Sequence, residues 1–154
     1  MSSIEKIPAL LVHFNGRGYA SGTPSVQRRN DGTHRIALGY GEAMFEDVWW
    51  GGNPFSGQES IALGKTVLWA MQYRGGMEPG HEAQAGETFT FLRRALSECS
   101  EAEPLRGPAE FNEGDWLYAN SWEGTLSEFE GREKIWHDSE HVYTGKYFGG
   151  AVAL

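Results

Sequence analysis

One sequence pattern occurs twice in this chain, about 74 residues apart. The first copy is Phe55-Ser-Gly-Gln-Glu-Ser-Ile61 followed by Trp69-Ala-Met-Gln-Tyr-Arg-Gly-Gly76, and the second is Phe129-Glu-Gly-Arg-Glu-Lys-Ile135 followed by Tyr143-Thr-Gly-Lys-Tyr-Phe-Gly-Gly150. A supersecondary unit used twice constrains the architecture before any single residue is interpreted. Two ordinary hairpins of similar turn-rich sequence are the alternative explanation. We expect a duplicated unit.

The first copy of the unit combines one short helix with strands. Ile7, Leu10, Leu11 and Phe14 have the spacing of an amphipathic helix, and Pro8 is tolerated if it lies in the first turn. A loop rich in glycine and small polar residues follows over residues 15–33. Residues 36–50 are aromatic and β-prone and predict a strand, and residues 58–73 predict a hairpin that turns at Gly64-Lys65.

The second copy repeats this order. Thr88 is a suitable N-cap for a helix whose apolar stripe includes Phe89, Leu92, Leu96 and Cys99. Residues 116–122, 132–136 and 141–148 have the strand pattern again. We therefore predict an α+β fold of two pseudo-symmetric repeats, each a helix plus about three antiparallel strands. Repeat one covers about residues 4–76, the linker residues 77–87, and repeat two about residues 88–150.

Composition limits the class of protein. A chain of 154 residues fits a single domain over residues 1–154. Cys99 is the only cysteine, so neither an intramolecular disulfide nor a cysteine-based zinc site is expected. The longest apolar run near the start, residues 9–12, is too short for a signal peptide or a membrane span. We expect a cytoplasmic protein that contacts no membrane, with no metal and no cofactor.

The formal net charge of −8 argues against direct nucleic-acid binding. Residues 98–140 carry twelve acidic side chains against three basic ones, and such a surface repels a phosphate backbone. The basic stretch from Arg17 to Arg35 lies in a loop without helical or aromatic context. We interpret it as a solvated loop.

A family resemblance lies in the same segments. The run Trp49-Trp-Gly-Gly-Asn-Pro-Phe-Ser-Gly-Gln-Glu59, then Val67-Leu-Trp-Ala-Met-Gln-Tyr73, Arg106-Gly-Pro108 and Tyr147-Phe-Gly-Gly150, resembles bacterial domain-of-unknown-function family 5680. The resemblance implies a bacterial protein, found in that family alone or behind a helix-turn-helix regulator domain. It implies no established activity and no catalytic residues.

Two glutamates are candidate catalytic residues. Glu59 and Glu133 occupy equivalent positions in the two copies, each two residues after a glycine. If the copies bring them together, they can act as general acid and base, or their repulsion can raise the pKa of one carboxyl. Each carboxylate can equally accept backbone hydrogen bonds at its own turn, and this structural alternative remains open.

Aromatic residues are the second unusual resource, since the chain has six tryptophans and six tyrosines. Large aromatic side chains usually fill a core, but an aromatic cleft edged by acidic groups suits a planar or cationic small molecule. We expect the site to be weighted toward the first copy. The candidate ligand-binding residues are Tyr40, Trp49, Trp50, Trp69, Met71, Tyr73, Tyr118 and Trp122.

Three functional hypotheses follow. The leading one is a small-molecule-binding domain with an aromatic cleft between the repeats, over which the loop of residues 15–34 closes as a lid. The second is a small-molecule enzyme, such as a hydrolase, lyase or cyclase, with Glu59 or Glu133 as acid or base. The third is a protein-interaction or dimerisation module, which buries exposed aromatic side chains against a partner, such as a second copy of the chain in a homodimer.

Overall fold

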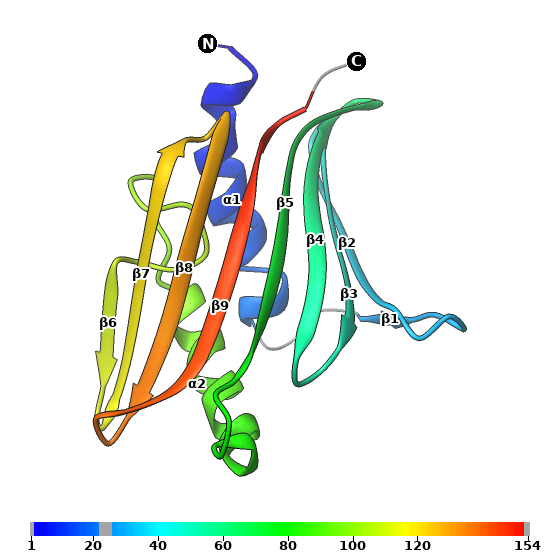
Figure 1. The fold of residues 1–154 in the computed structure, drawn as a ribbon. Coiled ribbons are helices and arrows are strands. Elements are labelled where there is room, and N and C mark those ends of the chain that lie inside the picture. Colours follow the sequence, from blue (N-terminus) through cyan, green and yellow to red (C-terminus); the bar gives the residue numbers. More distant parts are fainter. Residues whose placement is uncertain (1, 22–25, 153–154) are drawn as a thin grey trace.

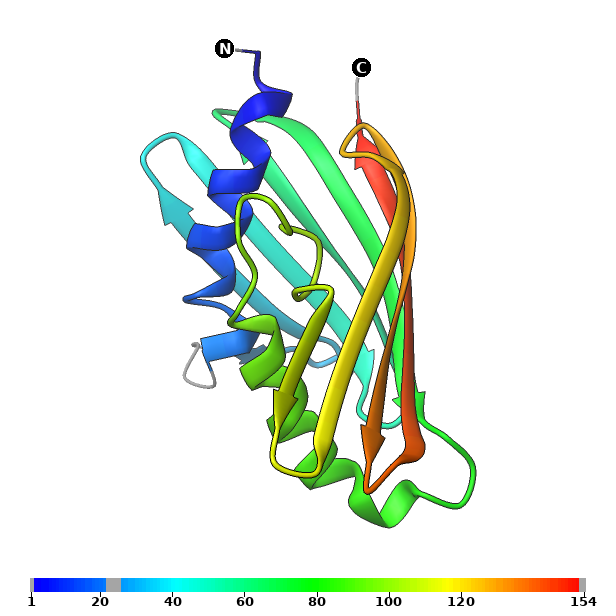
Figure 2. The same cartoon turned by 90° about the vertical axis from the view of Figure 1, so that its left-hand side faces the viewer.

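A single antiparallel sheet of nine strands, with two α-helices on one of its faces, forms the fold (Figure 1). The computed structural model describes residues 2–21 and 26–152. The strand order is β1-β2-β3-β4-β5-β9-β8-β7-β6. The sheet curls around both helices, which lie on the same side of it when the molecule is turned (Figure 2). The α+β prediction is confirmed.

The chain alternates between helix and strands. Helix α1 (Ile7–Asn15) follows a short 3-10 turn, η1 (Ile4–Lys6), and precedes η2 (Tyr19–Ser21). The strands that follow are β1 (Gln27–Arg28), β2 (His34–Tyr40), β3 (Ala43–Gly51), β4 (Phe55–Leu63) and β5 (Thr66–Met77). Then come η3 (Glu82–Gln84), α2 (Ala85–Leu96), β6 (Glu110–Glu113), β7 (Trp116–Thr125), β8 (Glu128–His137) and β9 (Glu140–Ala151). Strands β5 and β9 pair at the centre of the sheet.

The number of strands after each helix is larger than predicted. Residues 36–50 were expected to form one strand, but they belong to two, β2 and β3, which turn at Gly41-Glu42. Gly41 has a φ of +59°, a conformation that glycine adopts without steric penalty, so a two-residue hairpin is possible there. The strand β6 was not predicted either. In the described residues five strands, β1–β5, therefore follow α1, and four strands, β6–β9, follow α2.

The start of α2 also differs from the prediction. Thr88 was expected to cap the helix, but the helix begins at Ala85, and Thr88 is buried inside it. Glu87 lies in the first turn, where a negative charge interacts favourably with the helix dipole. The hairpin of β4 and β5 turns at Gly64-Lys65 as expected, and Pro8 lies in the first turn of α1.

The core has two clusters, one under each helix. The apolar side of α1, including Leu11 and Phe14, packs against Phe45, Ile61 and Trp69 of β3–β5. The apolar side of α2 packs against the second group of strands, and this cluster comprises Phe91, Leu92, Ala95, Leu96, Tyr118, Ile135, Val142 and Tyr143. Inward and outward residues alternate along the strands, as expected for a sheet with one covered face.

Glycines in the doubled motif give room to tyrosine rings on the neighbouring strand. Gly57 pairs with Tyr73, and Gly131 pairs with Tyr147. A Cβ atom on Gly57 would lie 2.5 Å from the Tyr73 hydroxyl and 2.6 Å from the Val48 carbonyl oxygen. A cross-strand aromatic ring of this kind covers the backbone that a strand glycine leaves open. The two glycines are therefore required for the packing of these tyrosines.

We expect the substitution Gly57→Ala to lower the free energy of unfolding by about 1–3 kcal/mol, because the added methyl displaces Tyr73 or the backbone of β3. Urea denaturation measures this change. Gly52→Ala is the matched control in the preceding turn, because a Cβ atom there meets no atom within 4 Å. Equal stability of the two variants would contradict the packing role of Gly57.

Candidate functional site

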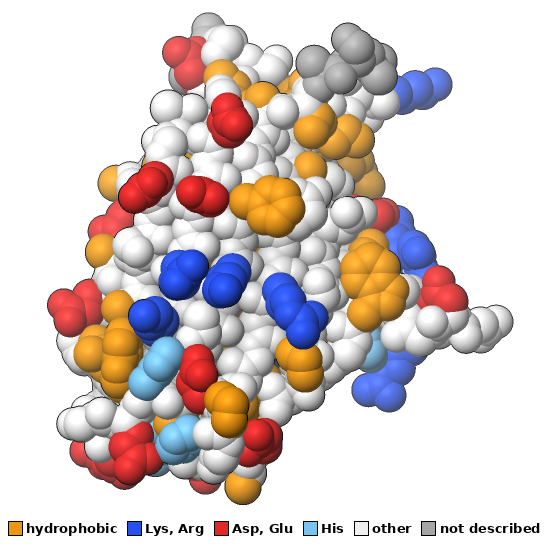
Figure 3. Space-filling view, in the orientation of Figure 1, with side chains coloured by type: hydrophobic (Ala, Val, Ile, Leu, Met, Phe, Trp, Pro, Cys, Tyr) orange, Lys and Arg blue, Asp and Glu red, His pale blue; other side chains and the backbone are white. Residues whose placement is uncertain are grey.

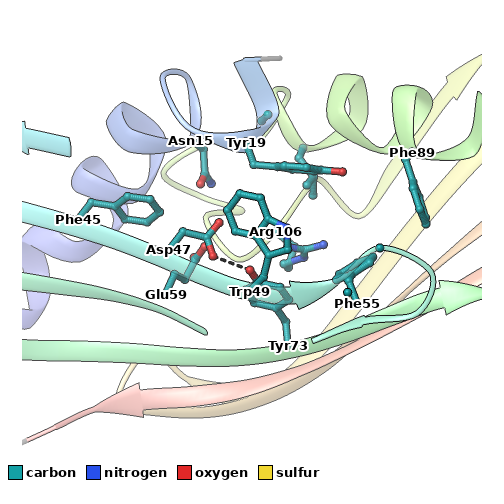
Figure 4. Close-up of a pocket in the computed structure, with 14 residues that line it drawn as sticks. Asn15, Tyr19, Phe45, Asp47, Trp49, Phe55, Glu59, Tyr73, Phe89 and Arg106 are labelled. Carbon is teal, nitrogen blue, oxygen red and sulfur yellow. Dashed lines mark hydrogen bonds between the residues drawn. The ribbon is translucent and has the colours of Figure 1, made fainter. Parts of the chain in front are cut away.

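A cavity of about 150 Å³ lies between the sheet and the helices, on the side of β3, β4 and β5 (Figure 4). Most of its wall is apolar and aromatic. The apolar side chains that line it include Phe45, Trp49, Phe55, Phe89 and Leu96, which come from β3, β4 and α2. Tyr19 and Ala20 of η2 close another side. A cavity with mostly apolar walls and a few convergent polar groups is typical of small-molecule sites.

The polar groups of the cavity come from three adjacent strands and one loop. Asp47 on β3 pairs with Glu59 on β4, so both carboxyls face the helix side of the sheet. The Tyr73 hydroxyl on β5 donates a hydrogen bond of 2.5 Å to Oδ1 of Asp47. Arg106, from the segment between α2 and β6, also lines the cavity, and its guanidinium lies 5.3 Å from the centre of the Tyr73 ring.

Glu59 is the unusual member of this group. Its side chain is 8% exposed and faces the cavity, yet its carboxyl forms no hydrogen bond with any residue that the structure describes. Burial, and next the charge of Asp47, raise the pKa of Glu59 to about 8, while Arg106 opposes the rise. Glu59 therefore carries a proton at neutral pH.

Asp47 titrates at lower pH than Glu59. Burial raises the pKa of Asp47 to about 6, and the hydrogen bond from Tyr73 and the charge of Arg106 limit the increase. The two carboxyls interact, so their protons are lost in two coupled steps. At neutral pH the pair holds one proton, on Glu59, and one negative charge, on Asp47. A neutral acid next to a carboxylate provides both a donor and an acceptor toward the cavity.

Glu133 lies in a different environment. Its carboxyl accepts hydrogen bonds from Arg106 Nε at 3.2 Å and Nη2 at 2.5 Å, and from the hydroxyls of Tyr118 at 2.7 Å and Tyr143 at 2.9 Å. The side chain is 1% exposed and does not line the cavity. Burial, the largest single influence, would lower the pKa of Arg106, but the charge and hydrogen bonds of Glu133 together with Tyr143 and Tyr118 hold that pKa well above its usual value. Glu133 thus anchors Arg106.

The two candidate glutamates are therefore not equivalent. Arg106 lies electrostatically close to both, but it forms its ion pair with Glu133 only. The hydrogen bonds of Glu133 come from the side chains of Arg106, Tyr118 and Tyr143, not from the backbone of its own turn as the structural alternative expected. Glu59 instead presents a proton-bearing carboxyl to the cavity, where it can act as an acid or bind a polar group.

The structure places the predicted ligand-binding residues in four environments. Trp49 and Tyr73 line the cavity. Trp69 and Met71 are fully buried under α1, and Tyr118 is buried against Glu133. Trp122 is half-buried and packs edge-on against Phe129. Tyr40 and Trp50 are 56% and 48% exposed, and Tyr40 stacks on His13.

Trp50 alternates along β3 with Trp49, which lines the interior cavity, so Trp50 points to the opposite face of the sheet. No described helix covers that face (Figures 1 and 2). That face presents basic side chains near its middle (Figure 3). Arg74, Lys146 and Arg132 are neighbours there through the strand register of β5, β9 and β8. Trp50 and the exposed Phe148 are therefore part of a charged outer surface that is separate from the interior cavity.

Several lining residues were not predicted from the sequence. Asp47 has a recognisable signal, because it follows Ala43 and Phe45 at the inward positions of β3 and is the charged residue in that apolar series. Phe55 was noted as part of the doubled motif but not as a lining residue. Arg106 has no periodic pattern around it, and it adopts a φ of +67°, which is uncommon for a residue other than glycine. Only the packed structure brings Arg106 to the cavity.

The comparisons with known proteins agree with the resemblance seen in the sequence. The fold and site define an α+β protein with an interior cavity on the concave side of an antiparallel sheet. The chain belongs to the family described as Domain of unknown function (DUF5680), whose model matches residues 47–152. Neither the curated proteins nor the solved structures include a match to this chain. The matched residues include Asp47, Glu59, Tyr73 and Arg106. The match begins within β3, so it does not include α1.

Two further properties bear on the kind of site. No helix in residues 2–21 and 26–152 has the length and apolar character needed to span a membrane. Among these same residues, no three His, Cys, Asp or Glu side chains are grouped so that they could hold a metal ion.

We expect Glu59→Gln to remove a pH dependence from the stability of the fold. The pKa of Glu59 rises from 4.5 in the unfolded chain to about 8 in the folded protein, so the folded state binds the proton more tightly. The contribution of Glu59 to the free energy of unfolding is therefore fully present below pH 4.5 and is lost as the pH rises to about 8. Relative to Glu59→Gln, the wild-type protein should lose on the order of 4 kcal/mol between pH 5 and pH 9.

Urea denaturation at pH 5, 7 and 9 measures this difference. Glu130→Gln, an exposed glutamate on β8, is the matched control and should differ little from the wild type at each pH. A constant difference between the wild type and Glu59→Gln across this range would show that Glu59 ionises normally.

The substitution Glu133→Gln should have a larger effect at neutral pH. It keeps the shape of the side chain but leaves the buried charge of Arg106 without its partner, and removing one partner of a buried ion pair lowers stability by about 3–5 kcal/mol. The free energy of unfolding at pH 7 measures the effect, with Glu59→Gln as the comparison. A variant as stable as the wild type would contradict the anchoring role of Glu133.

Proposed function

We propose that this chain is a small-molecule-binding domain and that its ligand occupies the cavity between β3–β5 and the helices. The observation that carries the proposal is the Glu59 carboxyl, which is buried, faces an aromatic cavity and has no hydrogen-bond partner among the described residues. A carboxyl that faces a cavity without a partner in the protein takes its hydrogen bonds from water or from a bound molecule, and a ligand that supplies them gains binding energy.

The size of the cavity restricts the ligand. A volume of about 150 Å³ accommodates a molecule close to benzene in size. The walls formed by Trp49, Phe55 and Phe89 favour a compact apolar or planar body. The polar wall of Asp47, Glu59 and Arg106 favours a polar group at one end of that body.

The segment after α1 contributes to the enclosure of the cavity. Asn15, Tyr19 and Ala20 lie against the cavity, in agreement with a lid role for the loop of residues 15–34. Residues 22–25 of that loop lie outside the described residues.

The finer expectations from the sequence belong to the same proposal. The doubled motif supports a duplicated unit, with α1 and β2–β5 as one copy and α2 and β6–β9 as the other. Membership of the family supports no activity of its own. We propose a bacterial, cytoplasmic protein, in line with the resemblance and the low cysteine content.

An enzymatic role is the second candidate, and the raised pKa of Glu59 favours it. A carboxylic acid that keeps its proton at pH 7 can act as a general acid, and a carboxylate next to it can act as a base. Glu59→Gln should then abolish turnover of any compound that the wild type converts. Retained turnover in this variant would remove Glu59 from the mechanism.

A thermal-shift screen of small metabolites tests the binding proposal. A ligand present at one hundred times its dissociation constant stabilises the folded state by about 2.7 kcal/mol. Since each kcal/mol raises the Tm of a chain of this size by about 2–4 °C, we expect shifts of several degrees for true ligands.

The variant Ala20→Trp provides the control, because the larger side chain fills part of the cavity from η2. Compounds that stabilise the wild type should have little effect on Ala20→Trp, whose fold is checked by circular dichroism. Equal shifts in both proteins, or no shift from a broad library, would contradict binding in this cavity.

A further inference from the structure

Two buried glutamates occupy matching places in the strand register, but only one has hydrogen-bond donors around it. Glu133 on β8 pairs with Asn120 on β7, and Glu59 on β4 pairs with Asp47 on β3. The Glu133 carboxyl accepts four hydrogen bonds, from Arg106, Tyr118 and Tyr143. The Glu59 carboxyl accepts none from the residues that the structure describes.

The difference follows from the neighbouring side chains. Ile135, two residues after Glu133, pairs with Tyr118 and Tyr143, whose hydroxyls reach the carboxyl. Ile61, two residues after Glu59, pairs with Phe45 and Trp69. Phe45 has no donor, and the buried Nε1 of Trp69 has no hydrogen-bond partner among the described residues. The donors that complete the Glu133 site are therefore missing at Glu59.

A second difference concerns the loop that carries the positive charge. The Asn120 side-chain amide donates to the carbonyl oxygens of Leu105 at 2.9 Å and Gly107 at 2.8 Å, and this seats Arg106 beside Glu133. At the matching position Asp47 has a carboxyl, which when ionised only accepts hydrogen bonds and cannot hold carbonyl groups in this way. The space next to Asp47 and Glu59 is the cavity.

Acidic groups outnumber basic groups near the cavity. Asp47, Glu59 and Glu133 contribute three carboxyls, and Arg106 is the cation that faces them. Arg106 binds Glu133 through Nε and Nη2, and the negative charge of Glu133 offsets the charge that Arg106 presents to a second anion. An additional anion in the cavity would be repelled by the ionised Asp47, whereas an additional cation would be attracted to Asp47, and to Glu59 once that carboxyl has lost its proton.

We propose that the ligand of this cavity is a compact organic cation with N–H donors, such as a primary amine on an apolar body of about six carbon atoms, bound through Asp47 and Glu59. The inference rests on the proposed binding function and names its ligand class. The ammonium group supplies to Glu59 the donors that Arg106 and two tyrosines supply to Glu133. The aromatic walls, including Trp49, enclose the apolar body and add cation–π attraction.

Binding of such a cation is coupled to loss of a proton. The titratable or charged groups that face Glu59 are Asp47 on β3, Tyr73 on β5, Cys99 after α2 and Arg106. The pKa of Asp47 is about 6, and those of Tyr73 and Cys99 lie above their usual values, so Glu59 is the group of this set that changes charge between pH 7 and pH 9. An ammonium ion stabilises the ionised form of Glu59 and releases its proton.

Three probes of similar shape and different charge test the inference with the wild-type protein. They are cyclohexylamine, whose pKa is close to the value of about 10.4 for lysine, cyclohexanol, and cyclohexanecarboxylate. Isothermal titration calorimetry at pH 7, 8 and 9, in two buffers of different ionisation enthalpy, gives the affinity and the number of protons released.

We expect the amine to bind about ten- to a hundredfold more tightly than the alcohol and the carboxylate not to bind. With a pKa of about 8 for Glu59, the amine should release about 0.9 proton at pH 7 and almost none at pH 9. Its affinity should rise about tenfold over the same range.

The variant Glu59→Gln separates charge from shape, with Glu130→Gln as its exposed control. Glu59→Gln should bind the amine at least about tenfold more weakly and release no proton, while its affinity for cyclohexanol stays within about twofold of the wild-type value. Glu130→Gln should behave as the wild type.

The outcomes distinguish the two proposals. If the alcohol binds as well as the amine without proton release, or if the carboxylate binds best, the cation inference is wrong. The proposal that the cavity binds a small molecule then still stands. If none of the three probes binds, and the metabolite screen also gives no stabilised complex, both proposals fail.

Discussion

The buried ion pair between Arg106 and Glu133 is the interaction on which the arrangement of the site depends. Arg106 belongs to the segment between α2 and β6, and Glu133 to β8, so the pair fixes an irregular segment against the sheet. Asn120 and Tyr118 add hydrogen bonds to the backbone on both sides of Arg106. A buried charge is stable only when it is paired and its remaining groups are hydrogen-bonded, and this site meets both conditions.

The same ion pair determines the chemistry of the cavity. Because Arg106 is bound to Glu133, its charge lowers the pKa values of Asp47 and Glu59 only in part, and burial of these carboxyls prevails. The sheet sets their separation, since both come from paired strands, and Tyr73 reaches Asp47 because Gly57 leaves room for its ring. Electrostatics and strand geometry thus act together at a single position in the fold.

Some of the fold and the site could be predicted from the sequence because local patterns encode them. The spacing of the apolar residues from Ile7 to Phe14 predicted α1, and the dipeptide Gly64-Lys65 predicted the turn between β4 and β5. The start of α2 and the turn at Gly41 were missed, since tertiary packing of Thr88 and a single positive φ decide them. Glu59, Trp49 and Tyr73 were recognised by residue type.

Arg106 and Phe89 could not be assigned to the cavity in this way. Their positions depend on where α2 and the following segment pack against strands that are distant in the sequence. Local periodicity describes which face of an element is buried, but it does not say which elements meet. A site built from several elements is therefore visible in part from the sequence and complete only after packing.

The contrast between Asp47 and Asn120 explains how one sheet forms a closed site and an open one. Both residues accept a hydrogen bond from a tyrosine on the central strands, Tyr73 and Tyr147 respectively. The amide of Asn120 has donors left over, and these hold the loop that brings in Arg106. The carboxyl of Asp47 has none when ionised, so no comparable backbone contact forms and the space beside it remains a cavity. A difference of one functional group at matching register positions thus separates a structural ion pair from a candidate ligand site.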